Sequence, residues 1–259
     1  GNVDISTIGH KEARQVKETL LSLPAHAKNG PYAGKSIRQL LAMNIPDSAK
    51  MHPRTVNEKI QRASSLFLWA VRHGYTQLNP FEGLKLRLHG KASEERAVFD
   101  PADLGKLFDP EYFSVDQLRK PFKYWVPLLS LYTGGRVQEI AQLRVQDVFE
   151  AEPGLWAIRI SDEAGGLKNQ SSRREIPLHP AIIQRGFLEY VERTRAAGHE
   201  RLFYEIWGSS KRGAGVTVSE WFTKYRKRLK IGRLRKGDGR PNKCFHSFRH
   251  CFADGLKQA

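Results

Sequence analysis

Four residues in the second half of the sequence have side chains that can bind or protonate a phosphate: Arg136, Lys168, His246 and Arg249. Each lies in a local sequence that could hold it in a fixed place, and no carboxylate cluster or phosphate-binding glycine loop accompanies them. Two guanidinium groups can neutralise a phosphate, while an ammonium and an imidazole can transfer protons. Together these four residue types predict phosphodiester chemistry without a metal.

The segment around Arg136 reads TGGRVQEIAQL. Its glycine pair predicts a tight bend, and the apolar spacing after it predicts a helix that begins at Arg136 and turns Ile140 and Leu143 toward the core. A helix start also leaves backbone N–H groups free, which suits an anion. Glu139 follows one turn later and could orient a neighbouring side chain. The alternative is an ordinary amphipathic helix with a surface arginine.

Lys168 lies in GGLKNQSSRREIPLHP, between two short stretches that favour strands. The glycine pair Gly165-Gly166 gives the connection conformational freedom, as in a β-hairpin. A lysine at the tip of such a hairpin could donate a proton to a substrate. The alternative is a solvated lysine in a turn.

His246 and Arg249 occur in HSFRHCFA, three residues apart, and so share one face of a helix that phenylalanines would anchor to the core. A competing interpretation is a zinc site, because possible ligands are close together in this segment: Cys244, His246, His250 and Cys251. The two cysteines would have to converge from different faces of one helix, which disfavours that site. We therefore assign no metal.

A basic strip precedes this helix: residues 224–243 contain ten Lys or Arg against one Asp. Glycines and a proline within it favour a loop that follows a helix, and the charge favours contacts with phosphates. The alternative is a solvated basic loop. The residues that we predict to contact nucleic acid are Lys224, Arg226, Lys227, Arg228, Arg233, Arg235, Lys236 and Lys243.

Charge and composition favour a nucleic-acid partner. The 259 residues carry a net charge of +16, of which residues 1–96 contribute +7 (15 basic, 8 acidic) and the remainder +9 (28 basic, 19 acidic). Distributed positive charge of this size is typical of folded proteins that bind a polyanion. No apolar run is long enough to span a membrane, and the two cysteines form no disulfide framework, which fits a reducing cytoplasm.

The elements that must position these residues are mainly helical. Residues 1–88 are predicted to form a helical domain, 89–98 a polar linker and 99–259 a second domain, mainly α with a small β-sheet (α+β). We expect helices near 10–23, 36–43, 53–74, from Asp100-Pro101, through WVPLLSLYT, from Arg136, and near 180–196, 217–230 and 245–258, with strands near 155–160 and 173–177. Two capping boxes are also predicted, Thr55 with Glu58 and Thr217 with Glu220.

In this order and spacing, the three segments resemble the tyrosine recombinase, or phage integrase, family. TGGR-x-x-E-I-x-x-L-x-x-x-D matches its first arginine segment, LKNQSSRREIPL its hairpin-lysine segment and HSFRHCFA its His-x-x-Arg segment. The matches span residues 130–254, and the helical region before them is similar in length and character to the family's core-binding domain.

The resemblance implies a clamp on double-stranded DNA and strand cleavage and rejoining through a 3′-phosphotyrosine intermediate. Arg136 and Arg249 would hold the scissile phosphate, Lys168 would protonate the leaving 5′ oxygen, and His246 would assist proton transfer. Glu139 would support the site from behind. It also implies that no metal or ATP is required, that the full-length protein forms a tetramer on DNA, and that it works in the bacterial cytoplasm, at the nucleoid.

The sequence departs from the family pattern in one respect. The family's nucleophilic tyrosine follows the His-x-x-Arg helix, whereas Tyr190, Tyr204 and Tyr225 all precede His246. We therefore expect the chain to be a fragment of a longer recombinase that binds DNA without cleaving it. Two other hypotheses remain open: a DNA-binding regulator on the same fold that has lost catalysis, and an RNA-binding or ribosome-associated basic protein.

Overall fold

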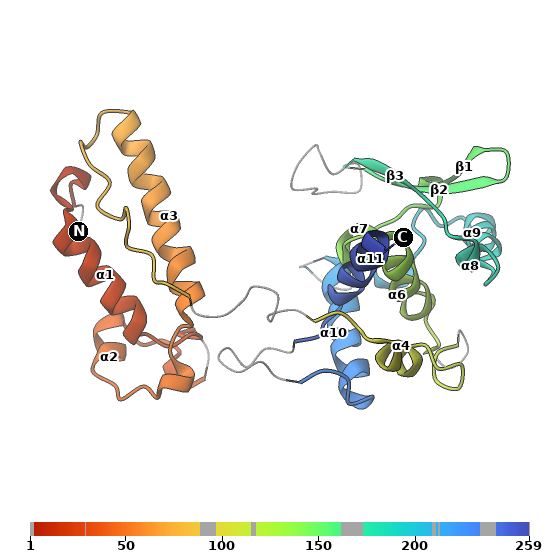
Figure 1. The fold of residues 1–259 in the computed structure, drawn as a ribbon, viewed down its shortest axis with the longest axis horizontal. Helices are drawn as coiled ribbons and strands as arrows, with labels where there is room; N and C mark the ends of the chain where they lie inside the picture. The colour runs from red at the N-terminus through yellow and green to blue at the C-terminus, as the bar shows by residue number, and fades with distance from the viewer. Residues whose placement is uncertain are drawn as a thin grey trace. The chain divides into compact units, whose positions relative to one another are not determined.

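The chain divides into two compact units, the first comprising residues up to Lys91 and the second most of the chain from Ala92 onward (Figure 1). Each unit has its own hydrophobic core. The computed structural model describes residues 3–28, 30–88, 97–114, 118–161, 173–208, 211, 213–233 and 242–258. Most of the predicted linker, 89–98, therefore lies outside the described residues.

The first unit is helical, as the sequence predicts. Its helices are α1 (His10–Ser22), α2 (Ile37–Leu41) and α3 (Pro53–Arg72), and α1 lies against α3. The core between them is small and consists of Ala13, Val56, Ile60, Phe67 and Phe81. The predicted Thr55–Glu58 capping box is wrong. The helix begins two residues earlier, at Pro53, where Nδ1 of His52 accepts a hydrogen bond from the Arg54 amide.

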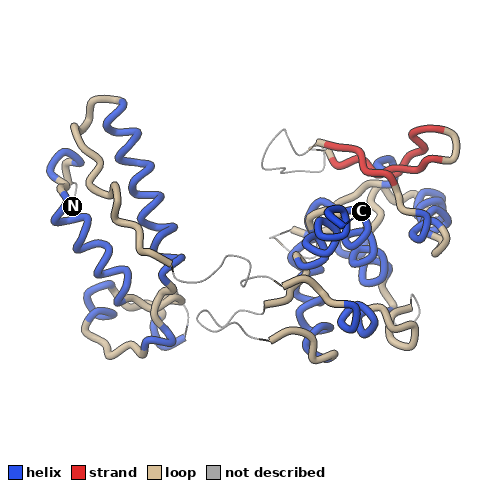
Figure 2. Tube along the Cα trace, viewed as in Figure 1, coloured by secondary structure: helices blue, strands red, loops and turns tan. Residues whose placement is uncertain are grey.

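The second unit combines helices with one small antiparallel sheet (Figure 2). The sheet has the order β1-β2-β3, formed by β1 (Val148–Glu152), β2 (Leu155–Ile160) and β3 (Arg174–Pro177). Ile158 lies opposite both Val148 and Ile176, so one row of aliphatic residues crosses the sheet toward the core. The sequence predicted β2 and β3 and missed β1.

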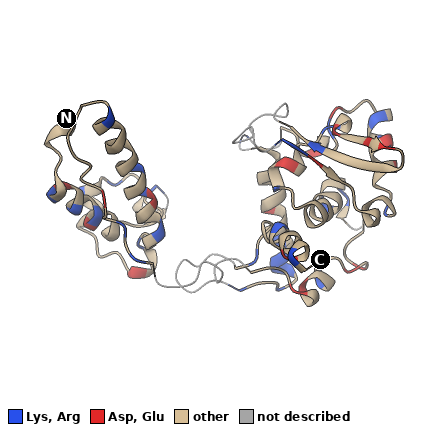
Figure 3. Ribbon diagram, turned by 45° about the horizontal axis from the view of Figure 1, so that its top comes forward, with Lys and Arg blue, Asp and Glu red and all other residues tan. Residues whose placement is uncertain are grey.

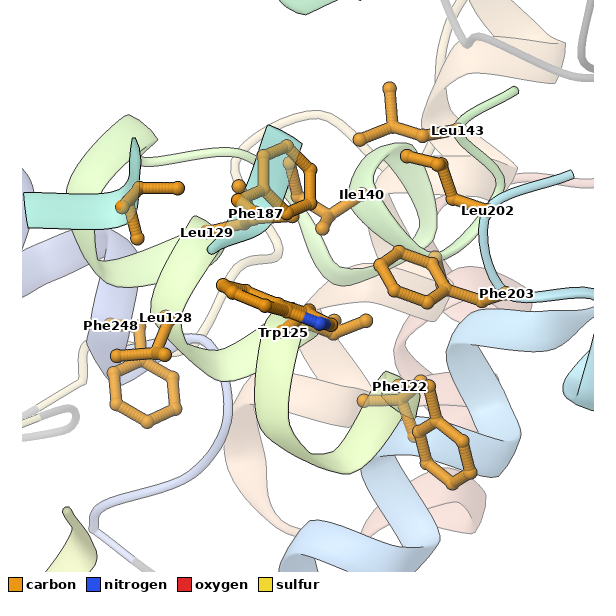
Figure 4. Packing of buried hydrophobic residues seen from close by; sticks show 14 of the residues in the cluster. Phe122, Trp125, Leu128, Leu129, Ile140, Leu143, Phe187, Leu202, Phe203 and Phe248 are labelled. Atoms are coloured by element: carbon orange, nitrogen blue, oxygen red, sulfur yellow. The ribbon is translucent and has the colours of Figure 1, made fainter. Parts of the chain in front are cut away.

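The helices of this unit are α4 (Pro101–Leu107), α6 (Pro121–Thr133), α7 (Val137–Ala141), α8 (Pro180–Ile183), α9 (Phe187–Ala196), α10 (Ala214–Arg228) and α11 (Ser247–Gln258). The centre of the core is α6, whose Trp125, Leu128 and Leu129 are buried among side chains from other elements (Figure 4). Helix α11 packs against α6, and α10 packs against α7.

Two predicted helix boundaries differ from the structure. The helix expected at 180–196 is divided into α8 and α9 at Gly186, whose φ of +85° no regular helix accommodates. Helix α10 begins at Ala214, three residues before Thr217, so the predicted capping box of Thr217 with Glu220 lies inside the helix and is wrong. By contrast, Asp100 caps α4 as predicted, because its side chain accepts a hydrogen bond from the Asp103 amide.

Candidate active site

The junction between α6 and α7 holds Arg136. Gly134 ends α6 in the left-handed conformation, with φ of +63°, and Gly135 is so closely packed that an added Cβ would lie 2.5 Å from Cδ1 of Ile140. Arg136 follows as the N-cap residue of α7, and its side chain is 53% exposed. Because α7 has only five residues, any anion binding here depends on the guanidinium rather than on the helix end.

Glu139 holds Arg136 from the buried side. Its carboxylate is 3% exposed and accepts three hydrogen bonds: Oε2 from the Arg136 amide at 2.9 Å, Oε1 from Nη1 of Arg136 at 2.7 Å, and Oε2 from Nη2 of Arg174 at 2.7 Å. Burial raises the pKa of Glu139, but the hydrogen bonds from the two arginines outweigh it and hold the pKa below its usual value. Glu139 is therefore an ionised anchor for Arg136.

Arg249 reaches the same junction from α11. Its Nη1 donates to the carbonyl oxygen of Gly134 at 2.5 Å, two residues before Arg136 in the sequence. One helical turn further along α11, the Phe252 ring lies so close that a Cβ on Gly134 would be 2.4 Å from Cδ1 of the ring. The structure thus brings Arg136 and Arg249, 113 residues apart in sequence, to one backbone turn.

His246 immediately precedes α11, one turn before Arg249. Its ring lies 4.9 Å from the ring of His250 at a near-perpendicular angle. Cys251 is engaged elsewhere, because its Sγ accepts a hydrogen bond from the Phe99 amide at 3.2 Å. Among the described residues, no three His, Cys, Asp or Glu side chains are grouped so that they could hold a metal ion. Lys168 lies outside the described residues.

Sequence reasoning missed Arg174, which forms the third hydrogen bond to Glu139. Alternate residues of a strand lie on the same face, so Arg174 shares its face with Ile176, which packs against the core. A charged residue on the apolar face of a strand requires a buried partner of opposite charge. An arginine on the same strand face as an apolar residue was therefore the sequence pattern that could have identified Arg174.

The predicted basic strip divides into two groups. Lys224, Lys227 and Arg228 are exposed near the end of α10. The two lysines line an open groove of about 680 Å³ between α10 and α7, whose other lining residues include Val137 and Gln138, directly after Arg136. Lys224 and Lys227 therefore lie on a groove that is also lined by the two residues following Arg136. Basic residues elsewhere are spread over both units (Figure 3).

The second group is committed to contacts within the protein. Arg226 is 4% exposed, and its Nη1 donates to the carbonyl oxygen of Ile231. The Lys243 side chain is 13% exposed and donates to the carboxylates of Asp100 and Asp103. Because Arg226 is buried and Lys243 is paired with two carboxylates, we remove these two residues from the predicted contact set. Arg233 is exposed, while Arg235 and Lys236 lie outside the described residues.

The two groups predict different stability effects for the neighbouring residues Arg226 and Lys227. We expect Arg226→Ala to lower the free energy of unfolding by about 1–3 kcal/mol, because the Ile231 carbonyl loses its donor. Lys227→Ala should change it by less than about 0.5 kcal/mol, as surface substitutions do. Urea unfolding monitored by tryptophan fluorescence would measure both. Unchanged stability in Arg226→Ala would return that residue to the candidate contact set.

Two of the tyrosines that precede His246 are unsuited to act as nucleophiles. The hydroxyl of Tyr190 donates to the Leu202 carbonyl, and that of Tyr225 donates to the Leu107 carbonyl at 2.9 Å. Burial raises the pKa of both phenols, that of Tyr225 to about 12. Tyr204 is 46% exposed and stacks on His199. We assign none of the three as a nucleophile.

The fold is similar to that of solved integrases bound to DNA. The Tn1549 transposon integrase in complex with a circular intermediate DNA is 16% identical, with 98% of this chain and 74% of that chain covered and a TM-score of 0.61. A lambda integrase dimer bound to a COC′ core site is 15% identical, with 100% and 74% covered and a TM-score of 0.58. A lambda integrase tetramer bound to a Holliday junction is 16% identical, with 96% and 60% covered and a TM-score of 0.55.

The chain therefore has the tyrosine recombinase fold, α+β with a small antiparallel sheet. No protein-family model matches the chain, and no curated protein matches it by sequence. Within the part of the chain that the structure describes, no helix has the length and apolar character that crossing a membrane requires.

Proposed function

We propose that the chain is the DNA-binding and catalytic core of a site-specific recombinase that cleaves and rejoins strands through a 3′-phosphotyrosine intermediate. The observation that carries this proposal is the hydrogen bond from Arg249 to the Gly134 carbonyl, because it joins the His-x-x-Arg helix to the turn that presents Arg136. Two guanidinium groups at one turn can bind the two nonbridging oxygens of a single phosphate.

Each residue then has a distinct role. Arg136 and Arg249 stabilise the charge that grows on the phosphate oxygens in the transition state, and Glu139 orients Arg136. Lys168 protonates the departing 5′ oxygen, and His246 assists proton transfer at the nucleophile. The attacking tyrosine is none of Tyr190, Tyr204 and Tyr225. It forms a covalent link to the phosphate and so conserves the energy of the phosphodiester bond.

The partner in this proposal is duplex DNA. Lys224 and Lys227 would hold phosphates beside the scissile one, since their groove is also lined by Val137 and Gln138, which follow Arg136. Arg228, which is exposed on the same helix, would add a further phosphate contact. The first unit is proposed as the core-binding domain that contacts the same duplex. Assembly into a tetramer on DNA and action at the bacterial nucleoid belong to this proposal. A DNA-binding regulator on the same fold remains the second candidate, favoured by the buried phenols of Tyr190 and Tyr225.

Salt-dependent binding tests the partner. We expect the chain to bind duplex DNA with an affinity that falls about 100-fold or more between 50 and 200 mM salt, because four or more phosphate contacts each release a counterion. Fluorescence anisotropy with a labelled duplex would measure this slope. Lys224→Ala and Lys227→Ala should each reduce the slope by about one unit.

The matched control is Arg195→Ala, which removes an exposed arginine of α9 that is paired with Glu192. Its slope should equal that of the unchanged chain. Absence of duplex binding even at low salt contradicts both DNA hypotheses, and tighter binding to duplex RNA than to duplex DNA would favour the RNA-binding hypothesis.

A further inference from the structure

Arg174, the first residue of β3, contacts the candidate site from behind. Its Nη2 donates to Oε2 of Glu139 at 2.7 Å, and its side chain is 30% exposed. The two residues are 35 positions apart in the sequence and belong to different elements, β3 and α7. None of the roles assigned above uses Arg174.

The three charged groups share one buried carboxylate. Oε1 of Glu139 accepts from the guanidinium of Arg136, while Oε2 accepts from the Arg136 amide and from Arg174. A guanidinium has five N–H donors, so Arg136 has further donors for another acceptor. With Arg174 present the group carries a net charge of one positive unit; without it, Glu139 and Arg136 would neutralise each other.

We propose that Arg174 is a positioning residue for Arg136: by sharing the Glu139 carboxylate, it keeps a positively charged guanidinium oriented toward the scissile phosphate. This inference rests on the proposed recombinase function. It predicts that loss of Arg174 affects the chemical step on a phosphodiester more than it affects the fold or duplex binding.

A purely structural ion pair is the competing explanation, and the same sheet offers a comparison. Arg159 of β2 pairs with Glu175 of β3 at 2.9 Å, but both side chains are about half exposed, as exposed pairs of little energetic consequence usually are. Glu139 is instead buried, and removing charges from water costs more than their attraction commonly returns. The buried Glu139 carboxylate binds both the main chain and the side chain of Arg136. Its main effect is therefore to orient Arg136 rather than to stabilise the fold.

The pH dependence provides a readout that a structural role would not change. Among the described residues, the charged groups that face Glu139 are Arg136 at the start of α7 and Arg174 on β3. Burial raises the pKa of Glu139, and the hydrogen bond from Arg174 is the largest of the opposing influences. Removing Arg174 should therefore raise the pKa of Glu139. Glu139 would then become protonated, and release Arg136, at a higher pH.

The experiment is single-turnover cleavage of a nicked suicide duplex across a range of pH, in the recombinase that carries this chain together with its tyrosine. We expect Arg174→Gln to lower the rate about 10-fold or more, as loss of a residue that orients a functional ligand does, and to move the acid limb of the profile upward. Arg174→Lys should restore part of the rate and return the acid limb toward its original position. Duplex affinity should change less than about threefold.

Three controls separate the possible failures. Arg159→Ala, on the neighbouring strand, should cleave at the unchanged rate. Thermal melts report whether each variant folds. If Arg174→Gln does not fold, the cleavage rate and the acid limb of Arg174→Lys test the inference instead. An Arg174→Gln rate equal to that of the unchanged protein overturns the inference, as does a loss shared equally by Gln and Lys with no shift of the acid limb. If Arg136→Ala also cleaves normally, the proposed function fails as well.

Discussion

Replacing either arginine at the α6–α7 junction should abolish strand cleavage while leaving most DNA binding intact. For Arg136→Ala or Arg249→Ala we expect the single-turnover rate to fall by about 10²–10³ or more, because loss of one donor to transition-state charge costs on the order of 3 kcal/mol and each guanidinium can supply two. Duplex affinity depends on many lysines and arginines, so it should fall only severalfold. Cleavage of a nicked suicide duplex and anisotropy measurements would report the two quantities separately.

Arg249 needs a second variant because it also has a structural contact. Its Nη1 donates to the Gly134 carbonyl, so Arg249→Ala could lose activity by displacing α11. Arg249→Lys keeps the charge and removes the planar fork, and Arg195→Ala on α9 serves as the exposed-arginine control. Undiminished cleavage by the alanine variant at either position would remove that residue from the site.

Helix boundaries were predictable where one residue determines the local backbone. Pro53 fixes the start of α3, Asp100 caps α4, and Gly134 ends α6 in a left-handed conformation that other residues rarely adopt. These signals act over three or four residues, so they remain visible in the sequence. The two capping boxes failed for the opposite reason. Their Ser/Thr-x-x-Glu spacing also occurs inside helices, where tertiary packing decides the start.

The strand β1 was missed because its sequence, VFEAE, is short and mostly exposed. Only Val148 is buried, and it gains its place by lying opposite Ile158 of β2. An edge strand of this kind is specified by its partner more than by its own residues. Arg226 was misjudged for a different reason: its guanidinium donates to the carbonyl oxygen of Ile231, five residues later, and helical periodicity does not predict the course of the chain after α10.

The candidate site shows the same division between local and distant interactions. Glu139 was predicted to orient a neighbouring side chain, and Arg136 lies only three positions away, whereas Arg174 reaches Glu139 from 35 positions away. No local periodicity encodes such a contact. The solved integrases share the fold at 15–16% identity, so the same arrangement of elements forms from sequences that differ at most positions.

The most disruptive small substitution that we expect is at Gly134. An alanine at this position would have to keep the φ of +63°, and its Cβ would lie 2.4 Å from Cδ1 of the Phe252 ring. The left-handed conformation costs about 1–2 kcal/mol, and overpacking against a ring adds about 1–3 kcal/mol. Gly134→Ala should therefore lower the free energy of unfolding by about 2–5 kcal/mol, measured by urea unfolding. It should also slow cleavage, because Phe252 and Arg249 belong to the same helix and would move together.

Gly154, at the β1–β2 turn, provides the matched control. Its φ is +80°, but a Cβ would meet no atom within 4 Å, so Gly154→Ala should show the conformational cost alone, about 1–2 kcal/mol, with normal cleavage. A double variant, Gly134→Ala with Phe252→Leu, should recover part of the lost stability, since a smaller side chain relieves the contact. Equal losses for Gly134→Ala and Gly154→Ala would show that α11 does not depend on close packing at this turn. The junction would then no longer explain how Arg249 is held beside Arg136.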